Sequence, residues 1–156
     1  MRVLFVCTGN TCRSALAEAI ARDEVALLGI SDVEISSAGV HAWDGAAASD
    51  GALLVALENG LDLSGHRATM LDKELLATQD LVLVMSPHHL QRAEALGGKG
   101  RTHLLSSYAS RGAISRAIVD PFGGDLEAFR EAYEDLRYEV HLAVERLAEE
   151  RARRQS

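Results

Sequence analysis

The chain has 156 residues and a formal net charge of −7, with 47% hydrophobic and 25% charged residues. This length and composition predict one globular domain with a single substantial core. The negative charge argues against a nucleic-acid-binding protein, which needs a basic surface. It leaves room for an enzyme that acts on phosphate esters, because such an enzyme can confine its positive potential to one pocket.

The cysteine content and the length of the apolar runs indicate the cellular compartment of the protein. Cys7 and Cys12 are the two cysteines, too few and too close together for a disulfide scaffold. The sequence shows no signal-peptide pattern, and its apolar runs are too short to cross a bilayer. We therefore expect a cytoplasmic protein without a membrane partner. The reducing environment of the cytoplasm would keep the Cys7 thiol reduced.

The first 60 residues alternate between strand and helix patterns. In chain order they predict strand 2–6, helix 15–29, strand 33–36 with its end at 37–39, loop 41–50 and helix 53–60. The first strand is short, continuous and apolar and is followed at once by turn residues, as is typical of a central parallel strand. Gly29 and Gly60 close the two helices as C-terminal caps.

The remainder of the chain continues this alternation. It predicts a short helix 70–76, strand 81–85, helix 87–96, strand 101–105, an irregular segment 106–119 and a long amphipathic helix from residue 126. The run from Leu81 to Met85 is the clearest buried strand, and Pro87 suits the first turn of the next helix. We expect one domain over residues 1–150 and a frayed tail over residues 151–156.

This order of elements predicts the fold class. Strands that alternate with helices give an α/β fold, here a single-domain three-layer sandwich with a central four-stranded parallel sheet and helices on both faces. In such folds, ligands bind beyond the carboxyl ends of the strands, at the point where the strand order reverses.

The segment Cys7–Ser14 lies at such a strand end and carries the chemistry. It leaves the first strand and opens into the first helix, so that backbone N–H groups and the helix dipole suit an anion. The helix field and Arg13 favour the thiolate of Cys7, which is the nucleophilic form. The planar fork of Arg13 can hold two oxygens of a tetrahedral oxyanion. The alternative is a structural cysteine with a locally paired arginine.

The spacing Cys-x5-Arg-Ser, so close to the N-terminus, resembles the low-molecular-weight protein tyrosine phosphatase family. The resemblance covers essentially the whole chain. It implies an enzyme that hydrolyses phosphorylated protein side chains through a cysteinyl-phosphate and releases inorganic phosphate. It also implies no cofactor and no metal, and we expect a monomer with no nucleic-acid partner.

The resemblance implies specific roles for the residues of this segment. Backbone N–H groups and side chains bind the phosphoryl oxygens, from Thr8, Gly9, Asn10, Thr11, Cys12, Arg13 and Ser14. The hydroxyl of Ser14 also donates to the Cys7 thiolate. Asp120, in the Asp-Pro pair before the last helix, protonates the leaving group and then activates water. Without the resemblance, Asp120 would be an ordinary turn aspartate.

The resemblance also implies roles for residues outside the segment Cys7–Ser14 and for two residues within it. Asn10 holds the loop in a left-handed conformation, and Ser37 and His66 bind Asn10 without a direct catalytic role. The alternative for His66 is a surface histidine. Trp43 forms a wall of the substrate cleft. Cys12 either forms a reversible disulfide with Cys7 or is a small buried residue of the loop.

Departures from the family pattern bear on the substrate. Ala15 stands where the family usually has proline. Thr11 replaces an aliphatic residue, and Phe122 with Gly123 replaces paired tyrosines, which resembles the bacterial protein-arginine phosphatase branch. A hydroxyl accommodates a planar guanidinium better than an aliphatic side chain does, so we expect phosphoarginine as substrate, with phosphotyrosine as the alternative. We expect Thr11, Trp43 and Phe122 to determine this specificity.

Other classes fit the sequence less well. An arsenate reductase needs further cysteines after Cys12, and a thioredoxin-like enzyme needs a Cys-x-x-Cys pair. A non-catalytic phosphoryl-binding module would not need Cys7, Arg13 and Asp120 together. His88 and His89 are adjacent, so on a helix they face different directions, and we predict two solvated side chains rather than metal ligands.

Overall fold

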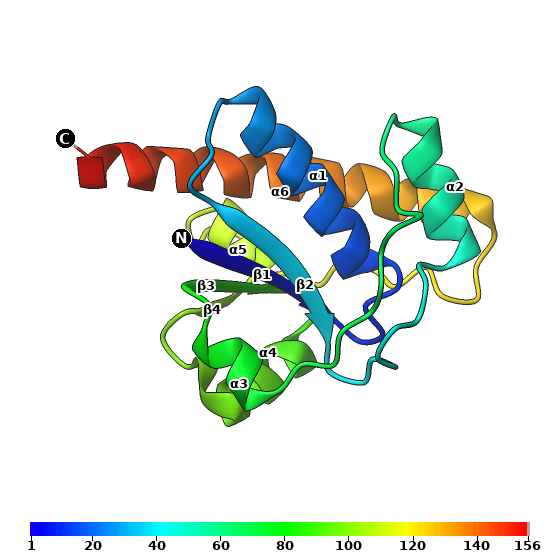
Figure 1. Cartoon of the computed structure of the whole chain (residues 1–156), viewed down its shortest axis with the longest axis horizontal. Coiled ribbons are helices and arrows are strands. Elements are labelled where there is room, and N and C mark those ends of the chain that lie inside the picture. The colour runs from blue at the N-terminus through cyan, green and yellow to red at the C-terminus, as the bar shows by residue number, and fades with distance from the viewer. Residues whose placement is uncertain (156) are drawn as a thin grey trace.

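The computed structural model describes residues 1–155. Four parallel strands form one sheet in the order β2-β1-β3-β4 (Figure 1). They are β1 (Arg2–Cys7), β2 (Glu34–Gly39), β3 (Leu81–Val84) and β4 (Thr102–Leu104). The predicted four-stranded parallel sheet is confirmed. β1 lies in its centre, with β2 on one side and β3 on the other, so the strand order reverses at the carboxyl end of β1.

Six α-helices and one π-helical turn connect and cover these strands. They are α1 (Arg13–Leu27), α2 (Asp50–Glu58), α3 (Lys73–Ala77), α4 (Pro87–Ala93), η1 (Glu94–Gly98), α5 (Leu105–Ala109) and α6 (Leu126–Gln155). Ser49 caps the N-terminus of α2, and its side chain accepts a hydrogen bond from the backbone N–H of Ala52.

Two local predictions are wrong, and a third is confirmed with a change of helix type. The helix expected over 70–76 starts only at Lys73, because Met70 forms a parallel bridge with Gly39 and Asp72 caps α3. The helix expected over 87–96 is confirmed in extent, with α4 followed by η1 after Ala93, and Gly97, with a left-handed φ of 105°, comes directly after the expected end. The segment expected to be irregular contains α5, which is held by the burial of residues such as Leu105 and Tyr108.

Two apolar layers enclose the sheet, one on each face. Side chains alternate along β1, so that Val3 and Phe5 face the layer of α1, α5 and α6. Leu4 and Val6 face the smaller layer that contains Leu76 of α3 and Ala93 of α4. Figure 1 shows α6 and α1 above the sheet and α3 and α4 below it. The predicted sandwich with helices on both faces is therefore confirmed.

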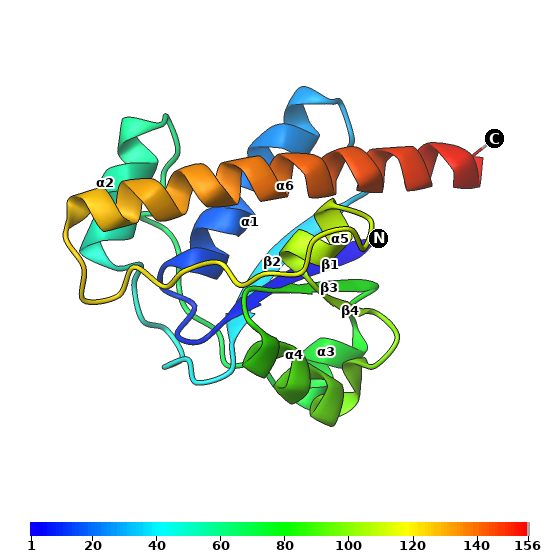
Figure 2. The same ribbon diagram turned by 180° about the vertical axis from the view of Figure 1, so that it is seen from behind.

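α6 is the longest element, with 30 residues, and lies across α1, α2 and α5 (Figure 2). It includes Arg151 to Gln155, while residue 156 lies outside the described residues, so the division of the chain at residue 150 stays a prediction. Over residues 1–155, no helix has both the length and the apolar composition that a membrane span requires.

Candidate active site

The loop between β1 and α1 forms the centre of the site. Cys7 is the last residue of β1, and Arg13 is the first residue of α1. Both side chains are buried, with relative exposures of 2% and 4%. The loop Thr8–Cys12 thus lies where the strand order reverses, and the N-terminus of α1 points its dipole at this position.

The backbone of this loop is held through its carbonyl groups. The carbonyl of Thr8 accepts from the N–H of His41 at 2.9 Å, and the carbonyl of Thr11 accepts from the N–H of Ser49 at 2.9 Å. Within residues 1–155, no N–H of Thr8–Cys12 donates to a protein acceptor. Buried N–H groups rarely lack partners, so this set of donors suits an anion.

Asn10 keeps the loop in this shape. Its φ of 55° is left-handed, a conformation that asparagine tolerates better than most residues do. Its side-chain N–H₂ donates to Ser14 Oγ at 2.7 Å and to Ser37 Oγ at 2.9 Å, and its Oδ1 accepts from the N–H of Thr69 at 2.9 Å. His66 Nε2 lies 2.6 Å from the Asn10 carbonyl oxygen. The structure thus brings Ser37 and His66 onto Asn10.

The end of β2 needs a glycine because it passes close to the loop. A Cβ atom on Gly39 would lie 2.4 Å from the Thr8 carbonyl oxygen and 2.9 Å from the Asn10 nitrogen. Backbone atoms cannot give way as a flexible side chain would. Gly39 therefore permits the loop and the sheet to meet.

Cys7 and Ser14 are in direct contact. The Cys7 Sγ atom lies 2.9 Å from Ser14 Oγ. Because Asn10 donates to this hydroxyl, its own hydrogen is available for the sulfur or for the Ala38 carbonyl oxygen, which is 3.4 Å away. The shorter contact is the one to the sulfur, and a hydrogen bond from Ser14 stabilises a thiolate.

Arg13 connects this loop with the segment that carries Asp120. Its Nη1 donates to Ser86 Oγ at 3.2 Å and to the Ile118 carbonyl oxygen at 3.0 Å. Its Nη2 lies 3.5 Å from Asp120 Oδ2. The other oxygen of Asp120 accepts from the N–H of Phe122 at 3.0 Å, which orients the carboxyl group. Two segments more than 100 positions apart in sequence thus meet at the guanidinium.

A cavity of about 250 Å³ opens over these groups. Its lining residues are Cys7, Thr8, Gly9, Thr11, Cys12, Arg13, Ser49, Asp120, Phe122 and Phe129. Ser49 and Phe129 were not predicted to line it, because one is a helix cap and the other belongs to the apolar stripe of α6. A Cβ atom on Gly51 would lie 2.6 Å from the Phe129 ring, so this glycine lets α2 approach the ring.

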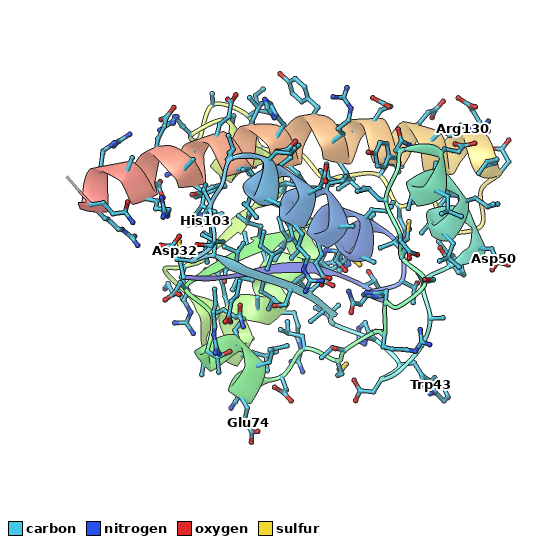
Figure 3. The ribbon with its side chains drawn as sticks, turned by 45° about the horizontal axis from the view of Figure 1, so that its top comes forward. Asp32, Trp43, Asp50, Glu74, His103 and Arg130 are labelled. Atoms are coloured by element: carbon cyan, nitrogen blue, oxygen red, sulfur yellow. The ribbon has the colours of Figure 1, made fainter. Side chains whose placement is uncertain are left out.

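Trp43 does not line this cavity. Its side chain is 84% exposed and extends away from the ribbon in Figure 3. A second hollow, of about 720 Å³, is lined by residues that include Glu18, Ser37 and His66. It contains neither Cys7 nor Asp120, so the smaller cavity is the candidate active site. The role of Trp43 as a cleft wall stays a prediction.

His89 contacts the loop, so its predicted solvation is wrong. The side chain is fully buried on α4, and its Nε2 lies 2.9 Å from Thr8 Oγ1. Burial, with smaller effects of His88 and Arg13, lowers the pKa of His89 from 6.5 to about 3. The imidazole is therefore neutral at physiological pH. Sequence reasoning missed this because two adjacent histidines give no apolar pattern, and only the packing of α4 shows that His89 is the buried one.

Cys12 differs from Cys7 in its surroundings. Both cysteines are free thiols in this structure. Burial, together with the nearby Cys7 and Asp120, raises the pKa of Cys12 from 9.0 to about 12. Cys12 is therefore protonated at neutral pH, and a protonated thiol is a poor nucleophile.

Comparisons with known proteins agree with this geometry. The family model for the low molecular weight phosphotyrosine protein phosphatase matches residues 2–153. The low molecular weight protein-tyrosine-phosphatase PtpB of Staphylococcus haemolyticus is 40% identical over 88% of this chain and 94% of that protein. The protein-arginine-phosphatase of Geobacillus stearothermophilus is 38% identical over 95% of this chain and 94% of that protein.

A solved structure is similar over the same length. It is that of the arginine phosphatase YwlE, as a cysteine-to-serine variant with a phosphorylated active-site serine. Its TM-score is 0.91 at 30% identity, over 97% of this chain and 99% of that one. A phosphoryl group on that serine is consistent with a mechanism through a cysteinyl-phosphate. The chain therefore belongs to the low molecular weight phosphotyrosine protein phosphatase family, and it is a protein phosphatase.

Proposed function

We propose that this enzyme hydrolyses phosphoarginine side chains of proteins, with Cys7 as nucleophile, Arg13 as phosphoryl-binding group and Asp120 as acid and base. The observation that carries the proposal is the Thr11 hydroxyl, which lines the same cavity as these three residues. Two relatives whose names are protein-arginine-phosphatase, at 38% and 30% identity, support it.

The first half of the proposed reaction forms a cysteinyl-phosphate. The Cys7 thiolate attacks phosphorus and the P–N bond of phosphoarginine breaks. The protonated Asp120 carboxyl gives its proton to the departing guanidine nitrogen. The loop N–H groups and the Arg13 guanidinium hold the three phosphoryl oxygens while charge spreads over them.

The second half releases inorganic phosphate. The Asp120 carboxylate accepts a proton from water as the water oxygen attacks phosphorus. The P–S bond breaks, and the electron pair returns to Cys7 as a thiolate that Ser14 stabilises through the 2.9 Å contact. The enzyme thus returns to its starting state without a cofactor.

The polar groups near the cavity support a guanidinium substrate. A Cβ atom on Gly9 would lie 3.7 Å from Thr11 Oγ1, so the hydroxyl lies close to Gly9, another residue that lines the cavity. Within residues 1–155, this hydroxyl has no hydrogen-bond partner. Thr11 can accept from one guanidinium N–H and the unprotonated oxygen of the Asp120 carboxyl from another, and phosphotyrosine offers neither donor.

Phosphotyrosine is the second candidate, and two aromatic side chains favour it. Phe122 and Phe129 line the cavity, and a phenyl ring can stack against either. The similarity to the tyrosine phosphatase PtpB, at 40% identity, supports the same substrate.

The deciding experiment compares two peptides of identical sequence that carry phosphoarginine or phosphotyrosine. We expect wild type to favour phosphoarginine in kcat/KM by about 10-fold or more, since a site that hydrogen-bonds its substrate rejects an analogue without the donor. Thr11→Ile should reverse the preference. Thr11→Val, which keeps the shape and loses the hydroxyl, should weaken it, and Thr11→Ser should keep it. A preference of wild type for phosphotyrosine would overturn the proposed substrate.

The proposal includes the setting of the enzyme. We infer a monomer that acts in the cytoplasm on phosphorylated proteins, with neither nucleic acid nor a membrane as partner. A net charge of −7 disfavours nucleic acid. Sedimentation at active concentrations tests the monomer.

A further inference from the structure

The segment that carries Asp120 belongs to no helix or strand. It occupies the positions between α5 and α6, and Figure 2 shows it running beside α6 before it turns into that helix. No helix or strand hydrogen bonds fix its backbone. The position of the Asp120 carboxyl over Cys7 therefore depends on separate contacts of this segment with the rest of the protein.

One group of contacts ties the segment to the sheet side. The N–H of Ile118 donates to the Met85 carbonyl oxygen at 2.8 Å, and Ile118 is buried. The N–H of Arg116 donates to Ser106 Oγ at 2.9 Å, and that hydroxyl donates to the Arg116 carbonyl oxygen at 2.7 Å. The backbone is thus held at two points within five residues of Asp120.

The Arg116 side chain ties the segment to α6. Its Nη1 donates to Asp135 Oδ2 at 2.9 Å, its Nη2 donates to Asp135 Oδ1, and the same Nη2 donates to Glu139 Oε1 at 2.9 Å. The guanidinium therefore binds one carboxylate with both arms and bridges to a second. Such paired, charge-assisted bonds fix orientation as well as distance.

The burial of Glu139 indicates that its contact with Arg116 is part of the folded core and not a chance contact at the surface. Its side chain is only 3% exposed and lies between Leu136 and Val140, on the inner face of α6. A buried carboxylate is costly unless it is paired, and within residues 1–155 its partner is Arg116. Exposed ion pairs of α6, such as that of Arg137 with Glu134, contribute little by comparison.

After Arg116, a cavity separates the segment from α6. This cavity has a volume of about 250 Å³ and is lined by Val119, Asp120, Pro121, Phe122, Gly124, Ala128, Glu131, Ala132 and Asp135. Direct packing of this part of the segment against α6 therefore does not fix the position of the Asp120 side chain relative to Cys7. The nearest fixed point on the α6 side is the Arg116 guanidinium, four positions before Asp120.

We propose that Arg116 is a positioning residue for the acid. By clamping the segment to Asp135 and Glu139, it holds the Asp120 carboxyl at the leaving-group side of Cys7. This inference rests on the proposed role of Asp120. An acid that is displaced by about an ångström loses much of its effect, and the loss falls on substrates whose leaving group needs the proton.

The test compares para-nitrophenyl phosphate, whose leaving group needs little protonation, with phenyl phosphate, whose leaving group needs it. We expect Arg116→Met to lower kcat/KM, which covers the steps up to formation of the cysteinyl-phosphate, by about 10-fold on phenyl phosphate and by no more than about 2-fold on para-nitrophenyl phosphate. Arg137→Met is the matched control, because it removes an exposed arginine of α6, and both rates should stay at the wild-type values.

A second variant distinguishes the effect of Arg116 on the position of Asp120 from its effect on the stability of the folded protein. Arg116→Met leaves the buried Glu139 without a partner and is expected to lower the melting temperature. Arg116→Met with Glu139→Leu removes that carboxylate, and we expect the melting temperature to return toward wild type. The selective loss on phenyl phosphate should remain, since the clamp is still absent. Recovery of the phenyl phosphate rate in this double variant would mean that Arg116 only neutralises Glu139, and the inference would be wrong.

Asp120→Asn in the same assay distinguishes this inference from the proposed function. If Asp120→Asn lowers kcat/KM equally for both substrates, Asp120 is not the acid, and the proposed function and this inference both fail. If Asp120→Asn selectively slows phenyl phosphate while Arg116→Met slows both equally, only the inference about Arg116 fails. Selective loss in both variants, without further loss when they are combined, supports the positioning role.

Discussion

The sulfur of Cys7 and the hydroxyl of Ser14 lie 2.9 Å apart in the interior of the protein. The hydroxyl also accepts from the Asn10 side chain at 2.7 Å, which leaves its hydrogen for the sulfur. A hydrogen bond to sulfur helps most when sulfur carries a full negative charge. Sulfur gains that charge when the thiolate leaves the cysteinyl-phosphate, so the contact should act chiefly on the second step.

Ser14→Ala should therefore make hydrolysis of the intermediate rate-limiting. A hydrogen bond to a charged group contributes about 1.5–3 kcal/mol, so kcat should fall about 10–100-fold. Rapid mixing with para-nitrophenyl phosphate should give a burst of nitrophenolate before the slow steady state. Ser37→Ala removes a different partner of Asn10 and keeps the contact with Cys7, so it should give no enlarged burst. A burst of equal size in the two variants would contradict this role.

The Cys7→Ser variant tests phosphate binding separately from turnover. The alcohol of serine is a far weaker nucleophile at neutral pH than a thiolate, so turnover should be lost. The loop N–H groups and Arg13 stay in place, so calorimetry should still detect phosphate or vanadate binding. Residual hydrolysis at a rate near that of wild type would exclude the covalent mechanism. Arg13→Ala should instead lose binding and turnover together.

Much of this site could be predicted from the sequence because its chemistry is contiguous. Cys7, Arg13 and the residues between them join a strand to a helix, and such a junction constrains its own geometry. Asp120 lies far away in sequence, and only the resemblance of its Asp-Pro pair to a family pattern assigns it a role. The alternating pattern likewise indicated the sheet and the layers, since β1 and β3 are short apolar runs.

The parts that sequence reasoning missed depend on tertiary contacts. α5 contains Ser106 and Ser107, weak helix formers, and its helical state depends on the packing of Leu105 and Tyr108. His89 is polar, and only the fold shows that it is buried. Glu139 carried a readable signal, an acidic residue three positions after Leu136 on an apolar stripe, but its partner Arg116 lies outside any periodic element.

Cys12 should stay unreactive while Cys7 is alkylated. Burial raises the pKa of the Cys12 thiol from 9.0 to about 12, so its thiolate fraction at pH 7 is negligible. We expect iodoacetamide at pH 7 to label Cys7 first and to inactivate the enzyme, as mass spectrometry of the digested protein would show. Cys7→Ser should take up almost no label below pH 9. Rapid labelling of Cys12 in that variant would contradict the raised pKa.

The buried His89 should make the protein less stable in mild acid. Its pKa is lowered from 6.5 to about 3, so between these values the unfolded chain binds one proton more than the folded one. Its contribution to the free energy of unfolding is therefore complete above pH 6.5 and falls by up to about 1.4 kcal/mol per pH unit as the pH drops toward 3.

Urea denaturation of wild type and His89→Gln at pH 7, 6, 5 and 4.5 measures this effect. The variant should be less stable at pH 7, because it loses the 2.9 Å contact with Thr8 Oγ1, yet its stability should decline less steeply with acid. His41→Gln alters an exposed histidine and should keep the wild-type slope. Parallel slopes for wild type and His89→Gln would mean that folding does not change the affinity of His89 for a proton.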